Sequence, residues 1–241
     1  MLKHLPKLLV GALLAFTFNA CAQNHDGAAG AAPETATAAA AASPAPAVAA
    51  EAGKNYFLID PPQPTASGDK VEVLEVFSYA CIHCAHFQPY ADEIKAKLPA
   101  YAQFSYMPAI FNDQWEAFAR AFYAAQSLGL LDKTHQAMFD AVHRDHRPFR
   151  SPDDIAAFYA EHGTTAKLFS EAANSFEVNS KIARSKDLVP KYGVDGTPTL
   201  IIDGKYRVTG ASAGGYPQLV ALVDLLVKKA HDEKSKGKSA K

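Results

Sequence analysis

The 241-residue sequence contains little cysteine and no excess of charge of either sign. Lys and Arg number 24 and Asp and Glu number 25, so the formal net charge is −1. This balance excludes a generally basic nucleic-acid binder and a strongly acidic, solvated chain. Only three cysteines occur, which excludes a scaffold held by many disulfides and concentrates cysteine chemistry in one place. Beyond the N-terminal region, no apolar run approaches the ~18 residues that a membrane-spanning helix requires.

Residues 1–21 have the three parts of an export signal. Two lysines begin the segment, an apolar stretch runs from Leu8 to Phe18, and small residues follow. The last of these residues, Cys21, allows two kinds of processing. Ala20-Cys21-Ala22 fits ordinary cleavage after Ala22, whereas the segment that ends at Cys21 resembles a bacterial lipobox, in which this cysteine is lipidated. We therefore predict export, and we favour lipidation of Cys21 over simple secretion.

Residues 22–53 form an Ala/Pro-rich segment in which alanine makes up 15 of the last 27 residues. Low complexity and scattered prolines are typical of a tether between a membrane and a folded domain. The residue after Cys21 is alanine rather than aspartate, a pattern usually sorted to the outer membrane. The expected location is thus the periplasm, with the protein anchored through lipidated Cys21.

Strand signals lie in residues 54–111 and 187–231, which we assign to one α/β domain. Apolar runs predict strands at 55–60, 71–77, 103–107, 199–202 and 205–209, and Asp203-Gly204 is a strong hairpin turn between the last two. Residues 71–77 are apolar at nearly every position, as in a central strand that is covered on both faces. A final helix is expected over 216–230, followed by a solvated Lys-rich tail over 232–241.

Residues 112–186 carry almost only helical signals and predict an inserted helical domain. Trp115, Phe118 and Phe122 recur at helical spacing and are interpreted as core. Four histidines of this region are interpreted as ordinary surface residues: His135, His143, His146 and His162.

The pair Cys81 and Cys84 lies where the strand 71–77 gives way to a helix that ends at Pro99. At a helix N-terminus the free N–H groups and the positive end of the helix dipole stabilise a thiolate, here that of Cys81. Cys84 lies one turn inside the helix and is better shielded. His83 between them adds a further charge or hydrogen bond for the thiolate. Such a pair is suited to the exchange of disulfides.

Two other uses of these cysteines were weighed. A structural disulfide across so small a loop would constrain little of the unfolded chain. A metal site is the stronger alternative, because His83 and His86 stand beside the cysteines, and a copper-binding chaperone therefore stays open. No second Cys/His pair follows at zinc-finger spacing, so we expect no metal.

Gly196-Thr197-Pro198 directly precedes the apolar strand 199–202, and proline is permitted at the first residue of a strand. A Cys-x-x-Cys motif that opens a helix, a strand begun by proline, a hairpin and a last helix together resemble the thioredoxin fold. With a helical insertion before Pro198, an export signal and Cys-x-His-Cys, the sequence resembles the DsbA family of periplasmic thiol oxidases, over about residues 55–230. The predicted fold class is thus α/β, a thioredoxin fold with an inserted helical domain.

The resemblance implies that Pro198 is cis and faces the redox-active Cys81–Cys84 disulfide. The sequence departs from well-known members at Ile82, where they carry proline, and at Thr197, where many carry valine. Members often place a lysine beside a buried acid on the next strand, and the equivalent position here is Ser105 or a neighbour.

Glu75 lies in the central strand, six residues before Cys81. Side chains at every second position of a strand point to the same face of the sheet, so Glu75 should share a face with Val71 and Val73. A buried carboxylate without a partner has a raised pKa and can relay protons, here to the thiol of Cys84. The alternative is a register that leaves Glu75 at an exposed strand end.

The sequence therefore predicts a protein dithiol–disulfide oxidoreductase that acts on unfolded exported proteins as an oxidase, since the helix N-terminus and His83 stabilise the thiolate of the reduced form. No organic cofactor is expected because the disulfide is the oxidant. The resemblance implies re-oxidation by a DsbB-like membrane quinone reductase. We expect a monomer. Isomerases of this fold are typically dimers built by a separate N-terminal domain, and residues 22–53 are too short and too rich in alanine to form one, which argues against an isomerase. A reductase or isomerase stays the alternative within the fold.

Overall fold

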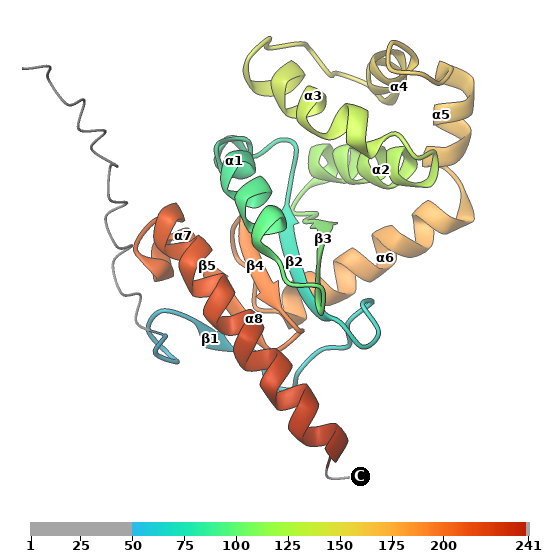
Figure 1. The fold of residues 1–241 in the computed structure, drawn as a ribbon. Helices are drawn as coiled ribbons and strands as arrows, with labels where there is room; N and C mark the ends of the chain where they lie inside the picture. The colour runs from blue at the N-terminus through green and yellow to red at the C-terminus, as the bar shows by residue number, and fades with distance from the viewer. Residues whose placement is uncertain (1–49, 240–241) are drawn as a thin grey trace, which may run out of the picture. The chain divides into compact units, whose positions relative to one another are not determined.

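The computed structural model describes residues 50–239 (Figure 1). The expected export signal, Cys21 and nearly all of the Ala/Pro-rich segment lie outside the described residues. Within residues 50–239, no helix combines the length and the apolar character that crossing a membrane requires.

A five-stranded sheet forms the centre, in the order β1-β5-β4-β2-β3. β2 pairs in parallel with β3 and antiparallel with β4, and β5 pairs antiparallel with both β4 and β1. Every predicted strand is present, although the first is only two residues long. β2 is buried at every position, as its apolar run predicts. The strands are β1 (Phe57–Leu58), β2 (Val71–Phe77), β3 (Ala102–Pro108), β4 (Thr199–Ile202) and β5 (Tyr206–Thr209).

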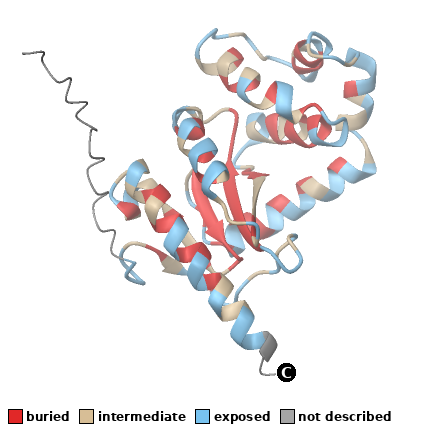
Figure 2. Ribbon diagram, in the orientation of Figure 1, coloured by how far each residue is buried: buried red, intermediate tan, exposed pale blue. Residues whose placement is uncertain are grey.

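Helices cover both faces of this sheet, which leaves the central strands β2 and β4 buried at every position (Figures 1 and 2). α1 (Ile82–Lys97) and α8 (Tyr216–Ser239) pack on one face, and α6 (Phe176–Lys191) packs on the other. Because successive side chains of a strand alternate between faces, Val71 and Val73 contact α1 and α8, and the even-numbered residues of β2 contact α6. Glu75 therefore faces α1.

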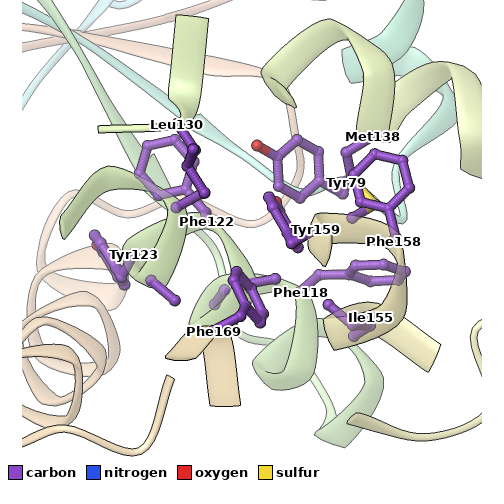
Figure 3. Packing of buried hydrophobic residues seen from close by; sticks show 14 of the residues in the cluster. Tyr79, Phe118, Phe122, Tyr123, Leu130, Met138, Ile155, Phe158, Tyr159 and Phe169 are labelled. Atoms are coloured by element: carbon purple, nitrogen blue, oxygen red, sulfur yellow. The ribbon is translucent and has the colours of Figure 1, made fainter. Parts of the chain in front are cut away.

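Four further helices form the predicted helical region: α2 (Asp113–Ser127), α3 (Leu131–His143), α4 (Pro152–Ala160) and α5 (Ala166–Ala173). They enclose an aromatic cluster that includes Phe118 and Phe122 (Figure 3). α4 begins with a capping box: the Ser151 hydroxyl accepts from the Asp154 N–H, and the Asp154 carboxylate accepts from the Ser151 N–H. α6 continues the helical stretch to Lys191, five residues past the predicted end of the insertion.

Trp115 does not join the aromatic cluster of Phe118 and Phe122. Its ring lies 5.0 Å from that of Phe111 and packs at the edge of the apolar layer between the sheet and α6. Trp115 is therefore not part of the core that contains Phe118 and Phe122, because it stands in the first turn of α2, where the helix passes the sheet edge.

The C-terminal tail also differs from the prediction. α8 continues to Ser239 instead of ending near Ala230. Two charged residues hold this extension to the β4–β5 hairpin: Glu233 accepts a hydrogen bond from the Tyr206 hydroxyl at 2.6 Å, and the Lys234 ammonium lies 2.6 Å from a carboxylate oxygen of Asp203. Asp203 is only 4% exposed, so its charge requires such a partner. Composition alone indicated a solvated tail because it does not show these contacts.

We expect a chain that ends after Ala230 to be less stable than the full chain. Truncation removes the contacts of Glu233 and Lys234 and leaves the buried Asp203 carboxylate with Lys205 alone, at 3.3 Å. The free energy of unfolding should fall by about 1–3 kcal/mol, as is usual when a buried polar group loses a partner. Urea denaturation measures the change, with a chain that ends after Lys236 as the matched control. Equal midpoints for the two truncated chains would show that the tail contacts add nothing.

Candidate active site

Cys81 and Cys84 lie at the junction of β2 and α1, as predicted. β2 ends at Phe77, a turn follows, and Cys81 is the N-cap residue of α1, with no side-chain capping bond of its own. The structure holds both cysteines as free thiols; Cys81 is partly exposed and Cys84 is fully buried. One sulfur is therefore accessible to a partner and the other is not.

The site lowers the pKa of the Cys81 thiol to about 5. The largest cause is a hydrogen bond from the thiol of Cys84, and the hydroxyl of Thr197 and the main-chain N–H groups of Cys84 and His83 add to it, while burial opposes them. These N–H groups belong to the first turn of α1, and that of Cys84 also donates to the Cys81 carbonyl at 3.1 Å. Cys81 is consequently a thiolate at neutral pH.

Cys84 shows the opposite behaviour. Burial is the main cause that raises the pKa of its thiol well above 9, and the hydrogen bond to Cys81 and the charge of Glu75 act in the same direction. Cys84 therefore keeps its proton while Cys81 is ionised. The site separates a nucleophilic thiolate from a protonated partner.

The contribution of His83 differs from its predicted form. Its main-chain N–H lowers the pKa of Cys81, and its main-chain carbonyl accepts a hydrogen bond from the Tyr216 hydroxyl at 3.3 Å. The imidazole is exposed to solvent. Stabilisation of the thiolate by the ring itself stays a prediction.

The loop before β4 lies against the reactive sulfur. The bond between Thr197 and Pro198 is cis, and the Cys81 sulfur lies 3.3 Å from the Thr197 carbonyl oxygen, to which it donates when the thiol is protonated. The buried Thr197 hydroxyl has no other hydrogen-bond partner within residues 50–239, so it is free to face the thiolate. Two residues 116 apart in sequence, Cys81 and Thr197, thus meet at one sulfur.

An open groove of about 610 Å³ runs beside Pro198. Its walls are His83, the loop before β4, the short helix α7 (Gly210–Ala213) and Tyr216. The ring of Tyr216 lies against Gly210 so closely that a Cβ there would come within 2.7 Å of it. Glycine at this position therefore lets the tyrosine ring close one end of the groove.

Glu75 is fully buried under α1, so the alternative of an exposed strand end is wrong. Neither carboxylate oxygen has a hydrogen-bond partner among the described residues. Burial raises the pKa of Glu75 to about 8, the negative charge of Cys81 adds to the rise, and Lys95 opposes it. The carboxyl group is thus poised to exchange a proton near neutral pH.

Of the predicted positions, Ser105 or a neighbour, the register selects the neighbour: Tyr106 stands opposite Glu75 on β3. Ser105 stands opposite Leu74, and its hydroxyl donates to Glu72 at 3.0 Å. The nearby positive charge comes instead from α1, where the Lys95 ammonium lies 4.9 Å from the centre of the Tyr106 ring. The lysine near the buried acid therefore lies on a helix, whereas many family members carry it on the strand.

Sequence reasoning missed several residues at this site, namely Tyr79, Lys95, His135, His143 and Tyr216. His135 is the clearest error among the supposed surface histidines: burial and the charge of Lys95 lower its pKa to about 3, so it is neutral. His135 and Phe139 are four residues apart in the sequence, a spacing that places both on one side of α3 and could have indicated a buried histidine. Across residues 50–239, no three His, Cys, Asp or Glu side chains are arranged to hold a metal ion.

The difference between the two thiols predicts how the reduced protein reacts with iodoacetamide. Cys81 should be alkylated with a midpoint near pH 5, whereas Cys84 should stay unmodified in the folded protein at neutral pH. Peptide mass mapping across pH 4–9 measures both. Unfolded protein in urea is the control, in which both thiols should titrate near ~8.5. Similar alkaline midpoints for both thiols in the folded state would contradict the assignment.

Glu75→Gln should stabilise the protein at neutral pH. The folded state keeps the Glu75 proton up to about pH 8, while the unfolded state loses it above ~4.5, so unfolding becomes easier as pH rises between these values. Removal of the charge should gain up to about 3 kcal/mol at pH 7 and little below pH 4.5. Urea denaturation at both pH values measures this, and Glu93→Gln, an exposed change on α1, is the control. An equal effect at both pH values would be inconsistent with a buried, titrating carboxyl.

Comparisons with known proteins agree with this geometry. The profile of the family described as DSBA-like thioredoxin domain matches residues 91–214. The thiol:disulfide interchange protein DsbA of Pseudomonas aeruginosa is 35% identical over 178 residues, which cover 74% of this chain and 84% of that protein. The protein of the same name from Pseudomonas syringae pv. tomato is 36% identical over 191 residues, or 79% and 88% of the two chains.

Solved structures give the same result. The crystal structure of Pseudomonas aeruginosa DsbA is similar with a TM-score of 0.73 and 34% identity, over 77% of this chain and 96% of that one. The oxidoreductase NmDsbA1 from Neisseria meningitidis has a TM-score of 0.67 and 26% identity, over 76% and 95% of the two chains. Sequence and structure together show that the chain belongs to the DsbA family of thiol:disulfide oxidoreductases.

Proposed function

We propose that this protein donates its Cys81–Cys84 disulfide to unfolded exported proteins and so acts as an oxidase. One observation carries the direction: the site lowers the pKa of Cys81 to about 5 and raises that of Cys84. A disulfide oxidises other thiols when its reduced form is the more stable one, and a stabilised thiolate exists only in that form. The reductase and isomerase alternatives require a less favoured thiolate.

The proposed reaction passes two electrons from substrate to protein. A substrate thiolate attacks Cys81 in the oxidised protein, a bond forms between these sulfurs, and the Cys81–Cys84 bond breaks. Cys84 leaves and takes up a proton, for which Glu75 beneath α1 is the donor. A second substrate thiolate then attacks the substrate sulfur of the mixed disulfide, and Cys81 leaves as a thiolate. The substrate gains a disulfide and the protein is left as the dithiol.

The substrate chain would lie in the groove beside Pro198. Residues 195–197 line this groove, and the Thr197 carbonyl also faces the reactive sulfur, so an extended peptide can add strand-like hydrogen bonds there. Thr197 would act through its carbonyl and hydroxyl, both of which face Cys81. Recognition of main chain rather than side chains suits an enzyme that acts on many unfolded proteins.

The dithiol must be oxidised again, and the family resemblance supports a DsbB-like membrane quinone reductase as the oxidant. In that half-reaction Cys81 attacks the disulfide of the partner, and Glu75 accepts the Cys84 proton as Cys84 displaces the partner. Lipidation of Cys21 would keep the protein at the membrane where that partner resides. Mass spectrometry of the mature protein tests the anchor: a free N-terminus at Gln23 would exclude it.

The direction of the reaction is tested by the stability of the two redox forms. We expect the reduced protein to unfold at a higher temperature than the oxidised protein at pH 7. The depressed pKa of Cys81 stabilises the folded dithiol above pH 5, and this gain is lost as the pH falls through 5. Calorimetry of both forms at pH 7 and pH 4.5 measures the difference. A reduced form that melts below the oxidised form at pH 7 would mean that the protein is a reductase.

The alternative of a copper-binding chaperone has its own test. Titration of the reduced protein with Cu(I) should show only weak, non-stoichiometric binding if disulfide exchange is the function. A tight one-to-one complex, in a protein that fails to oxidise an unfolded reduced substrate, would favour the chaperone.

A further inference from the structure

Three residues of α3 form a continuous stripe along one side of the helix. His135, Phe139 and His143 are four residues apart, so their side chains lie above one another. All three contact Tyr79: the His143 Nε2–H donates to its carbonyl at 2.8 Å, His135 Nδ1 lies 2.9 Å from its hydroxyl, and Phe139 packs edge-on with ring centres 5.0 Å apart. We call these residues the α3 stripe. One residue is thus held at its main chain, its ring and its hydroxyl.

Tyr79 belongs to two parts of the protein at once. Tyr79 is 1% exposed. Its ring lies in the aromatic cluster of the helical region, near Phe118 and Tyr159 (Figure 3). Its main chain, however, lies two residues before Cys81, in the loop that joins β2 to α1. Tyr79 therefore connects the helical region to the redox centre directly.

The loop is a tight turn whose central peptide is held by α3. The Cys81 N–H donates to the Ser78 carbonyl at 3.1 Å, which places Tyr79 and Ala80 at the two central positions. The main types of such turns differ in the orientation of the peptide between these positions, and the turn's own hydrogen bond does not involve its carbonyl. That carbonyl belongs to Tyr79 and accepts from His143. His143 thereby selects one orientation of the turn.

Cys81 follows this turn immediately and is the N-cap of α1. Its thiolate depends on its placement against Cys84, Thr197 and the first N–H groups of the helix. Hydrogen bonds weaken steeply with distance and angle, so rotation of the turn would weaken several of them together. The orientation that His143 selects is the one in which these groups converge on the sulfur.

We propose that the α3 stripe positions the redox centre by holding Tyr79, with His143 and His135 as positioning residues that never touch the reacting sulfurs. The proposal rests on the proposed role of Cys81 as the reactive thiolate. His135 suits the task because it is neutral, so it holds the tyrosine hydroxyl without adding a charge near Glu75. The helical insertion is then a working part of the active site.

Substitutions at each contact test the proposal. His143→Leu removes the donor to the Tyr79 carbonyl, His143→Gln keeps an N–H donor, and Tyr79→Phe removes only the hydroxyl that meets His135. His162→Leu is the matched control, because His162 Nδ1 makes the same kind of contact with the Phe158 carbonyl, at 2.7 Å, away from the redox centre. Two quantities are measured on folded protein: the thiolate pKa of Cys81 by ultraviolet absorbance, and the redox equilibrium with glutathione. Thermal unfolding is recorded in parallel.

His143→Leu should raise the pKa of Cys81 by half a unit or more and make the protein about threefold less oxidising against glutathione, since one unit corresponds to a factor of ten. Tyr79→Phe should shift both quantities in the same direction by less, and His143→Gln should restore most of the loss. His162→Leu should change only the unfolding temperature. Wild-type values in His143→Leu would overturn the role of His143, and wild-type values in Tyr79→Phe would overturn that of His135, whatever happens to stability. An ordinary alkaline pKa in the wild-type protein would instead refute the proposed function.

Discussion

The reactive site depends on the meeting of one thiolate with the first turn of α1. Cys81 stands where the helix begins, so the thiol of Cys84 and the N–H groups of Cys84 and His83, all in the first turn, converge on its sulfur. The same helix carries Cys84 inward, where burial keeps its proton. Two thiols three residues apart thus differ in charge because the helix boundary falls between them. The rest of the fold serves to hold that boundary in place.

Burial of Glu75 without a hydrogen-bond partner among residues 50–239 destabilises the fold when the carboxyl group is ionised, and it keeps a proton on this group near Cys84. A carboxyl group without partners in a central strand disfavours its own ionisation, and burial is the main reason that its pKa rises to about 8. Lys95 moderates the effect from α1, but its ammonium pairs with Asp92 at 2.9 Å and not with Glu75. A direct pair with lysine would return the carboxyl to its ionised form and remove it from proton transfer near neutral pH.

Local patterns in the sequence were enough to place the redox centre and the sheet. The buried run 71–77, the Asp203-Gly204 turn and the cysteines at a strand–helix junction are short-range signals, and each is present where expected. What the sequence left open or got wrong concerns partners that are distant in sequence. Strand register decides that Tyr106, the neighbour of Ser105, stands beside Glu75. The contacts of Glu233 and Lys234 extend a helix that composition indicated to be solvated. No spacing within one segment reveals either.

The histidines of α3 illustrate the same limit at the active site. Residue type suggested a solvated surface, and only the fold shows that His143 reaches the main chain of Tyr79, 64 residues earlier. The redox centre is consequently assembled from three distant segments: the β2–α1 junction supplies the sulfurs, the loop before β4 supplies Thr197, and α3 holds the turn before Cys81. An insertion that merely enlarged the protein would have no need to contact that turn. Since α3 contacts both the main-chain carbonyl and the hydroxyl of Tyr79 in this turn, the helical region and the thioredoxin fold share a single site.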